Sequence, residues 1–109
     1  MKWEIIYYNS DLEEEILGLP DGLLARYIRL TELMEIYGAD LGMPHAEALG
    51  KGLFELRVKA KEGIARIFYC TKVGKRIHML HSFIKKTQKI PNKELKLARK
   101  RMQEVKNNA

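Results

Sequence analysis

The chain of 109 residues has a single cysteine, no long hydrophobic run and no histidine cluster. Cys70 cannot form an intrachain disulfide, and the N-terminus lacks the basic and apolar segments of a signal peptide, so we expect a cytoplasmic protein. No stretch is apolar over the roughly 20 residues that cross a bilayer, so we expect no membrane partner.

Residues for several chemistries are missing as well. His45, His78 and His81 do not have the spacing of zinc ligands, and no acidic pair lies among the basic segments, which argues against two-metal nuclease chemistry. No Cys/His or Ser/His arrangement favours covalent catalysis, and Gly50 and Gly52 alone do not make a phosphate-binding loop. We therefore predict neither a metal nor a cofactor.

Charge is distributed unevenly along the chain. The net charge is +6, but residues 1–50 hold three Lys or Arg and ten Asp or Glu, whereas residues 51–109 hold seventeen and four. The basic half favours a polyanion as partner, with the acidic half as a rim that restricts its approach. A solubilising surface that segregates along the chain is the alternative. The length predicts a single domain over residues 1–109.

The first half predicts one strand and two helices. Residues 3–8 are rich in β-branched and aromatic side chains and predict a strand, and Ser10 with Glu13 forms a capping box for a short helix. Residues 21–38 predict a longer helix whose apolar stripe we expect in the core. The stripe consists of Leu23, Tyr27, Leu30, Met34 and Tyr37. Residues 39–50 contain three helix and strand breakers and predict a connector.

The second half predicts three strands and a final helix. Alternating apolar and polar residues indicate antiparallel strands at residues 53–59, 64–71 and 76–84. After Pro91, an apolar stripe predicts a helix with basic residues on its other faces. We expect an α+β fold of order β-α-α-β-β-β-α, with two N-terminal helices, a C-terminal helix and a compact antiparallel-rich sheet whose helices pack on one face.

Three segments carry a resemblance to a known family. They are KGLFELRVK at residues 51–59, ARIFY at residues 65–69 and HSFIKKTQKIP at residues 81–91. In this order they resemble the phage-derived HigB-like branch of the RelE/ParE toxin superfamily, and the other predicted elements match the RelE-like layout. The third segment, with its paired lysines and Thr-Gln-Lys, is the most specific of the three.

The resemblance implies the toxin of a type II toxin–antitoxin system, a ribosome-dependent endoribonuclease that cuts messenger RNA. Its implied partners are the ribosome, mRNA and a cognate helix-turn-helix antitoxin, through which alone the toxin would meet DNA. Because a fold does not define its target, a gyrase-directed ParE-like toxin, a nonenzymatic nucleic-acid-binding module and an inactive prophage remnant remain alternatives.

Cleavage through the ribose 2′-hydroxyl requires an activated hydroxyl, a stabilised phosphorane and a protonated 5′-oxygen. Arg binds two phosphate oxygens at once and Lys supplies a movable charge, so a metal-free basic site is chemically coherent. The local pattern and the resemblance together give the catalytic candidates Arg66, Lys86, Lys85 and Arg57. The predicted RNA-binding residues are Lys89, Lys59, Lys96 and Lys100.

Each catalytic candidate also has a structural interpretation. Arg66 shares a strand face with apolar residues, where a charge needs a cleft or a carboxylate, so a salt bridge to Glu55 is the alternative. Arg57 lies on the same strand face as Glu55, which favours a solvated ion pair. The lysines in residues 85–89 would otherwise form a solvated basic loop.

The histidines and one phenylalanine have competing interpretations. His81 would serve as a general base, but its alternation with Met79 and Phe83 favours packing on one sheet face. His78 is the weaker candidate, and His45 lies in the connector, where a surface position is equally consistent. Phe83 would stack on a nucleobase or belong to the core.

The chain departs from the family pattern in three places. Glu47, Ala48 and Leu49 stand where relatives often carry basic residues, so one expected cation is missing. Ala65 replaces a common Tyr, and Ile90 replaces a capping Thr. We expect these departures to affect efficiency and codon preference rather than the fold.

Overall fold

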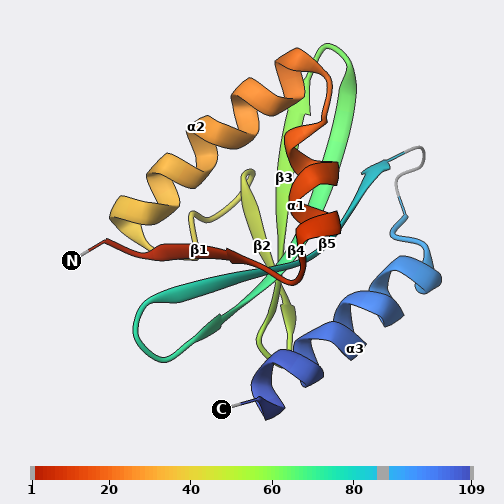
Figure 1. The fold of residues 1–109 in the computed structure, drawn as a ribbon. Coiled ribbons are helices and arrows are strands. Elements are labelled where there is room, and N and C mark those ends of the chain that lie inside the picture. The colour runs from red at the N-terminus through yellow and green to blue at the C-terminus, as the bar shows by residue number, and fades with distance from the viewer. Residues whose placement is uncertain (1, 86–88, 109) are drawn as a thin grey trace.

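The computed structural model describes residues 2–85 and 89–108, in which helices flank a single sheet (Figure 1). The elements in chain order are β1 (Glu4–Tyr7), α1 (Ser10–Leu17), α2 (Asp21–Tyr37), β2 (Ala46–Gly50), β3 (Leu53–Ala60), β4 (Gly63–Lys72), β5 (Arg76–Lys85) and α3 (Asn92–Asn107). This is the predicted α+β class, with one strand more than expected.

The sheet has five strands in the order β1-β5-β4-β3-β2. β1 runs parallel to β5, and the other neighbouring pairs are antiparallel, so the sheet is antiparallel-rich as predicted. The parallel pair arises because α1 and α2 carry the chain from the β1 edge across to the β2 edge.

β2 lies within residues 39–50, which we expected to be a connector without a strand. Its pairing with β3 places Ala46 beside Leu56 and Glu47 beside Glu55. The sequence conceals this strand because its residues, Ala-Glu-Ala-Leu-Gly, include no β-branched side chain. Pairing with β3, rather than local propensity, makes the segment a strand.

α1 and α2 cover one face of the sheet (Figure 1). The predicted stripe of α2 is buried there at four of its five positions, Leu23, Tyr27, Leu30 and Met34. The prediction is wrong at the fifth position, because Tyr37 is 75% exposed. Trp3 packs against Gly38 at this end of the helix and joins the core instead.

α3 packs on the opposite face, which corrects the expectation that all helices share one face. Met102 of its predicted stripe is buried in a second apolar cluster with residues of β3, β4 and β5. Phe68 and Cys70 of β4 are apolar residues on the side away from α1 and α2, so this face would expose apolar surface to water if α3 did not pack on it. Arg101 Nη1 donates to the Leu80 carbonyl at 2.8 Å and ties α3 to β5.

The N-cap of α1 lies one residue before the predicted capping box. Asn9 has extended backbone with φ of −156°, and its side-chain oxygen accepts a hydrogen bond from the Leu12 N–H at 2.8 Å. Ser10 is instead the first helical residue. Asn and Ser cap equally well, so the extended backbone that continues from β1 to Asn9 decides between them.

Part of the face that carries α3 is open and lined by charged residues. In the sheet register, Arg57 of β3 lies beside Arg66 of β4. One step further along the strands, Lys59, Ile64 and Lys85 lie side by side. All five residues line a pocket, so the fold presents basic side chains from three adjacent strands at one place.

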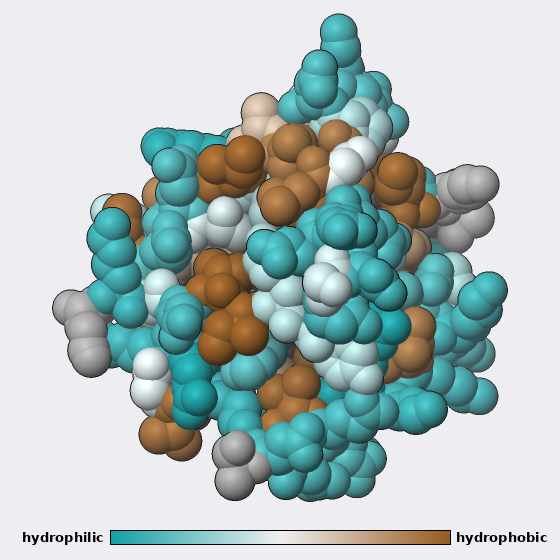
Figure 2. Space-filling view, viewed as in Figure 1, coloured by the Kyte–Doolittle hydropathy of each residue, from teal (hydrophilic) through white to brown (hydrophobic). Residues whose placement is uncertain are grey.

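The surface in the view of Figure 2 is mostly hydrophilic, with hydrophobic residues in separate small patches. The large exposed hydrophobic side chains of the described residues include Ile36, Tyr37 and Val73. Within residues 2–85 and 89–108, no helix combines the length and the apolar character needed to span a membrane.

We expect Tyr69→Phe to lower the free energy of unfolding by about 1 to 3 kcal/mol, because it leaves a buried carbonyl without its donor. The Tyr69 hydroxyl donates to the Ala39 carbonyl at 2.5 Å and so ties β4 to the segment after α2. Urea denaturation measures the change. Tyr37→Phe, at an exposed position, is the matched control and should change stability by less than about 0.5 kcal/mol. Equal losses in the two variants would contradict this account.

Candidate active site

The open part of the sheet forms a pocket of about 990 Å³. α2, the segment before β2, and strands β2 to β5 all contribute to its wall, together with the segment that precedes α3. The pocket is strongly basic, since six of its lining side chains are cationic and one is acidic. The charged lining residues are Arg26, Glu47, Arg57, Lys59, Arg66, Lys85 and Lys89.

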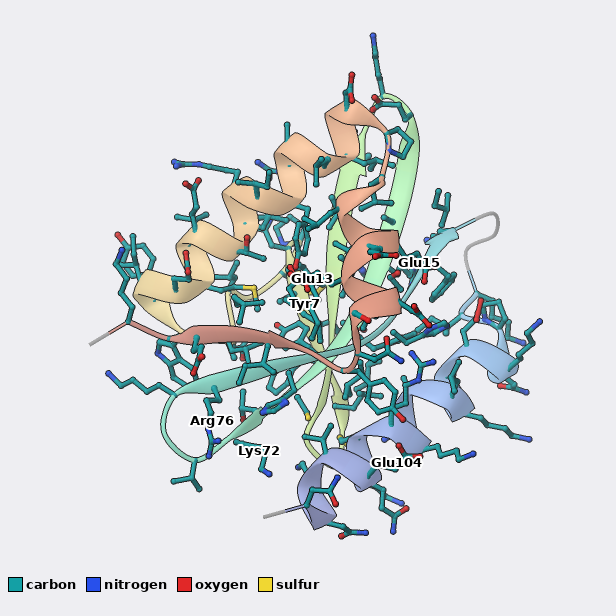
Figure 3. All side chains as sticks on the ribbon, in the orientation of Figure 1. Tyr7, Glu13, Glu15, Lys72, Arg76 and Glu104 are labelled. Atoms are coloured by element: carbon teal, nitrogen blue, oxygen red, sulfur yellow. The ribbon has the colours of Figure 1, made fainter. Side chains whose placement is uncertain are left out.

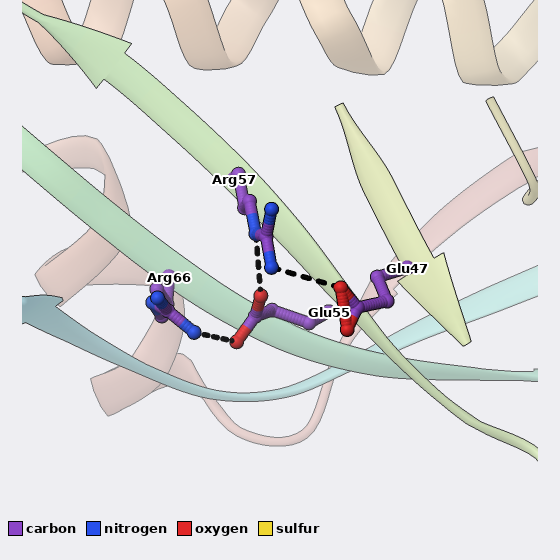
Figure 4. A network of polar contacts seen from close by, with 4 residues as sticks. All are labelled: Glu47, Glu55, Arg57 and Arg66. Carbon is purple, nitrogen blue, oxygen red and sulfur yellow. Dashed lines mark hydrogen bonds and ion pairs between the residues drawn. The ribbon is translucent and has the colours of Figure 1, made fainter. Parts of the chain in front are cut away.

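Glu55 is the centre of a polar network at the pocket (Figure 4). Its carboxylate is fully buried and uses both oxygens. Oε2 accepts from Arg66 Nη1 at 2.6 Å, and Oε1 accepts from Arg57 Nε at 3.0 Å. Arg57 Nη2 also donates to Glu47 Oε1 at 2.8 Å. One buried carboxylate therefore holds two guanidinium groups beside each other.

The contacts of Glu55 test the structural interpretation that we gave for each arginine. Arg66 forms the salt bridge to Glu55 that was its alternative, and only 3% of this residue is exposed. Arg57 also pairs with Glu55, but the expected solvated pair is wrong, because Glu55 has no exposed surface. The Arg57 side chain retains 30% exposure, so it can contact a ligand while it remains paired.

Lys85 lies at the end of β5, beside Ile64. Burial is the main cause that lowers the pKa of Lys85 below the ordinary lysine value of 10.5, and the positive charges of Arg66 and Arg57 lower it further. The negative charge of Glu55 opposes this shift. A lysine with a lowered pKa gives up its proton more readily, which suits a group that protonates a leaving oxygen.

Arg26 and His45 belong to the pocket, and sequence reasoning missed their connection. Arg26 projects from α2, and its Nη2 lies 3.4 Å from His45 Nδ1. The His45 carbonyl accepts a hydrogen bond from the Arg57 N–H at 2.8 Å, which places His45 next to the network. The only sequence signal was the unusual length of residues 39–50, since the pairing depends on a strand that local propensity does not predict.

The pocket brings together five of the eight predicted site residues. Arg57, Arg66 and Lys85 of the catalytic set line it, as do the predicted RNA-binding residues Lys59 and Lys89. Lys96 and Lys100 are exposed on α3 and do not line it. Lys86, the remaining catalytic candidate, lies outside the described residues.

His81 has a structural position between β5 and α3. Its Nε2 lies 2.8 Å from Glu94 Oε1, and its ring stacks with Phe68 and Phe83. A register shift in the β4–β5 pairing puts Met79 in the core under α1 and α2, so Met79 and His81 do not share a face as expected. Phe83 is half-buried in this stack, with its ring 5.7 Å from that of Phe68.

His78 lies away from the pocket. Its Nε2 is buried without a hydrogen-bond partner among the described residues. Burial lowers its pKa, and the positive charges of Lys72 and Arg76 add to the effect. Figure 3 shows Lys72 and Arg76 near the β4–β5 turn, far along the sheet from residue 85. The neutral form that results fits a structural role.

Acidic residues cluster on the helical side of the molecule. Figure 3 shows Glu13 and Glu15 on α1, which covers the face opposite to α3. Both are exposed. The charge asymmetry of the sequence therefore becomes an asymmetry between an acidic helical layer and a basic pocket. In the part of the chain that the structure describes, no three His, Cys, Asp or Glu side chains form a group that could hold a metal.

We expect Glu55→Gln to lower the free energy of unfolding by about 3 kcal/mol, because it leaves two guanidinium charges without their buried counter-charge. Glu47→Gln is the matched control. It removes a more exposed ion pair of Arg57, whose loss should cost less than about 1 kcal/mol. Denaturation of the two variants with urea compares them directly. A similar loss in both would show that Glu55 does not organise the site.

The lowered pKa of Lys85 predicts a pH-dependent stability difference from Lys85→Met. At neutral pH the folded protein carries a charge that its surroundings disfavour, so the variant should be the more stable protein. The difference should shrink as pH rises from the folded-state pKa towards the unfolded value of 10.5, because the folded protein loses this proton first. Urea denaturation over this range tests it, and a variant less stable at neutral pH would contradict it.

The fold and much of the sequence match known proteins. A crystal structure of an archaeal RelE–RelB complex from Pyrococcus horikoshii OT3 superposes with a TM-score of 0.57 and 16% sequence identity, over 77% of this chain and 96% of that chain. This likeness establishes a RelE-like fold. None of the curated proteins matches the chain. Residues 14–103 match the family described as phage-derived protein Gp49-like (DUF891). The resemblance seen in the sequence is thereby confirmed, and the chain belongs to the phage-derived Gp49-like family.

Proposed function

We propose that this protein is the toxin of a type II toxin–antitoxin pair and acts in the cytoplasm as a ribosome-dependent mRNA endoribonuclease. The observation that carries the proposal is the pocket lined by six cationic side chains, two of which are held by the buried carboxylate of Glu55. Such a site fits a phosphodiester, because guanidinium and ammonium groups complement phosphate oxygens. The RelE-like fold and the Gp49-like family agree with this chemistry.

The pocket residues have different roles in RNA binding, which follow from how exposed each side chain is. Arg57 is the main phosphate contact, since its side chain is partly exposed and its orientation is fixed by Glu55. Arg66 is almost fully buried and supports the site chiefly by holding the other oxygen of Glu55. Lys59 is exposed and provides a movable charge for the flanking phosphates.

Fixed cations stabilise the reaction more than mobile ones do. The phosphorane formed by attack of the 2′-hydroxyl carries two negative charges, and donors already in place need no reorganisation when that charge develops. The Glu55 network supplies this order, because it fixes Arg57 before RNA arrives. RNA needs to displace only the partly exposed carboxylate of Glu47 to use both N–H groups of Arg57 Nη2.

The remaining basic residues serve binding. Lys96 and Lys100 are exposed on α3, outside the pocket, where they would contact ribosomal RNA without sequence preference. The protein partner is an antitoxin with a helix-turn-helix domain, as the family resemblance implies. The toxin contacts DNA only through this antitoxin. The structural neighbour, RelE from Pyrococcus horikoshii, is itself found in complex with RelB.

A purified translation system tests the proposal. Ribosomes programmed with a reporter mRNA are mixed with the protein, and cuts are mapped by primer extension. We expect cuts in the wild-type reaction that disappear without ribosomes. Arg57→Met should reduce the cleavage rate at least about 100-fold, because it removes one preorganised donor to the phosphorane.

Arg29→Met is the matched control, since Arg29 is exposed on α2 and does not line the pocket. It should cleave like the wild type. Thermal melting verifies that both variants are folded. If the wild type makes no cuts on ribosomes but arrests growth when expressed in bacteria, the nuclease proposal is overturned and a gyrase-directed or purely binding toxin is favoured. Equal activity of both variants would show that the pocket is not the site.

A further inference from the structure

His45 is the only histidine among the described residues that line the pocket. We propose that His45 is the general base that takes the proton from the attacking 2′-hydroxyl, with Arg26 as its positioning residue. This inference rests on the proposed nuclease function and adds the proton-transfer group to it. It is carried by the place of His45 in the fold, its contact with Arg26 and the chemistry of the residues around it.

The backbone fixes His45 at the edge of the phosphate site. Its N–H donates to the Gly42 carbonyl at 3.0 Å, and its carbonyl accepts from the Arg57 N–H at 2.8 Å. The next residue, Ala46, begins β2 and lies beside Leu56 in the sheet register. The residue just before β2 and the main phosphate-binding arginine on β3 are therefore held beside each other, one at each end of a backbone hydrogen bond.

Arg26 determines which nitrogen of His45 carries the proton. A guanidinium group can only donate, so at 3.4 Å from Arg26 Nη2 the Nδ1 atom must be the acceptor. The neutral ring then carries its N–H on Nε2 and keeps a lone pair on Nδ1. This hydrogen bond is long, so Arg26 can exchange it for a shorter and stronger contact with an RNA phosphate. Substrate binding would thus free Nδ1.

The charged side chains that line the pocket are cations apart from Glu47, whose carboxylate is paired with Arg57, and this favours His45 as the proton acceptor. Guanidinium groups stay protonated at any physiological pH, whereas imidazole exchanges protons near neutrality. The charged residues that line the pocket with His45 are Arg26 from α2, Glu47 from β2, Arg57 and Lys59 from β3, Arg66 from β4, and Lys85 and Lys89.

The reaction balances with residues already in the pocket. As His45 Nδ1 takes the 2′-hydroxyl proton, the 2′-oxygen forms a bond to phosphorus. The bond from phosphorus to the 5′-oxygen breaks, and the Lys85 ammonium gives that oxygen a proton. The products are a 2′,3′-cyclic phosphate and a 5′-hydroxyl, after which His45 returns its proton to water and Lys85 regains one. The lowered pKa of Lys85 suits it to the acid step.

Single-turnover cleavage on programmed ribosomes tests the role of His45. His45→Gln keeps an oxygen that can accept from Arg26 but cannot take a proton, so we expect the rate to fall about 100-fold or more. The pH–rate profile of the wild type should contain a limb that His45→Gln lacks, because only a group that takes a proton in the reaction contributes one. Added imidazole should restore cleavage by His45→Ala, because it fills the space left by the side chain.

Controls separate this role from a merely structural one and from failure of the proposed function. Arg26→Lys keeps the positive charge and should change the rate less than His45→Gln while retaining the limb of the pH–rate profile that His45→Gln lacks. Thermal melting must give a folded transition for each variant. If wild type cleaves, and His45→Gln cleaves within about threefold of it with the same pH profile, the inference is wrong. If wild type makes no cuts on ribosomes, the proposed function itself fails.

Discussion

The buried carboxylate of Glu55 is the constraint on which the candidate site depends. A charge without exposed surface is costly unless it is fully paired, and here each oxygen meets a different arginine. The antiparallel register makes this geometry available, because it places Arg57 beside Arg66 with Glu55 two residues away on the same strand face. Removing the carboxylate would leave neighbouring guanidinium groups to repel each other. The same pairing fixes the cations before RNA binds, so one interaction serves stability and catalysis together.

A second constraint is the division of one sheet face between an apolar part and a charged part. α3 covers the apolar part around Phe68 and Leu80, and the hydrogen bond between His81 and Glu94 joins helix and sheet beside it. The charged part stays open because its residues could not be buried against a helix without partners for every charge. The position of α3 therefore determines the extent of the pocket, although none of its residues lines the wall.

The sequence predicted the elements with strong periodicity and missed those made by long-range pairing. Four of the five stripe positions of α2, the strands β3 to β5 and five of the six cations of the pocket follow from local pattern and family resemblance. β2 could not be predicted in this way, because it is a strand only through its pairing with β3. For the same reason the position of His45 beside β3 was not predicted. Alternation also placed Glu55 on the solvated side of β3, since a single sequence does not show that two arginines cover that carboxylate. The second apolar face of β4 likewise concealed where α3 would pack.

The chemical structure of the cut RNA ends tests the central claim most directly, because it reports the nucleophile. Fragments from programmed ribosomes treated with the wild-type protein can be identified by mass spectrometry. Attack by the ribose 2′-hydroxyl in a pocket of fixed cations predicts a 2′,3′-cyclic phosphate, or the 3′-phosphate formed by its hydrolysis, opposite a 5′-hydroxyl. A 3′-hydroxyl opposite a 5′-phosphate would mean that water attacked the phosphodiester, and would contradict this account of the site.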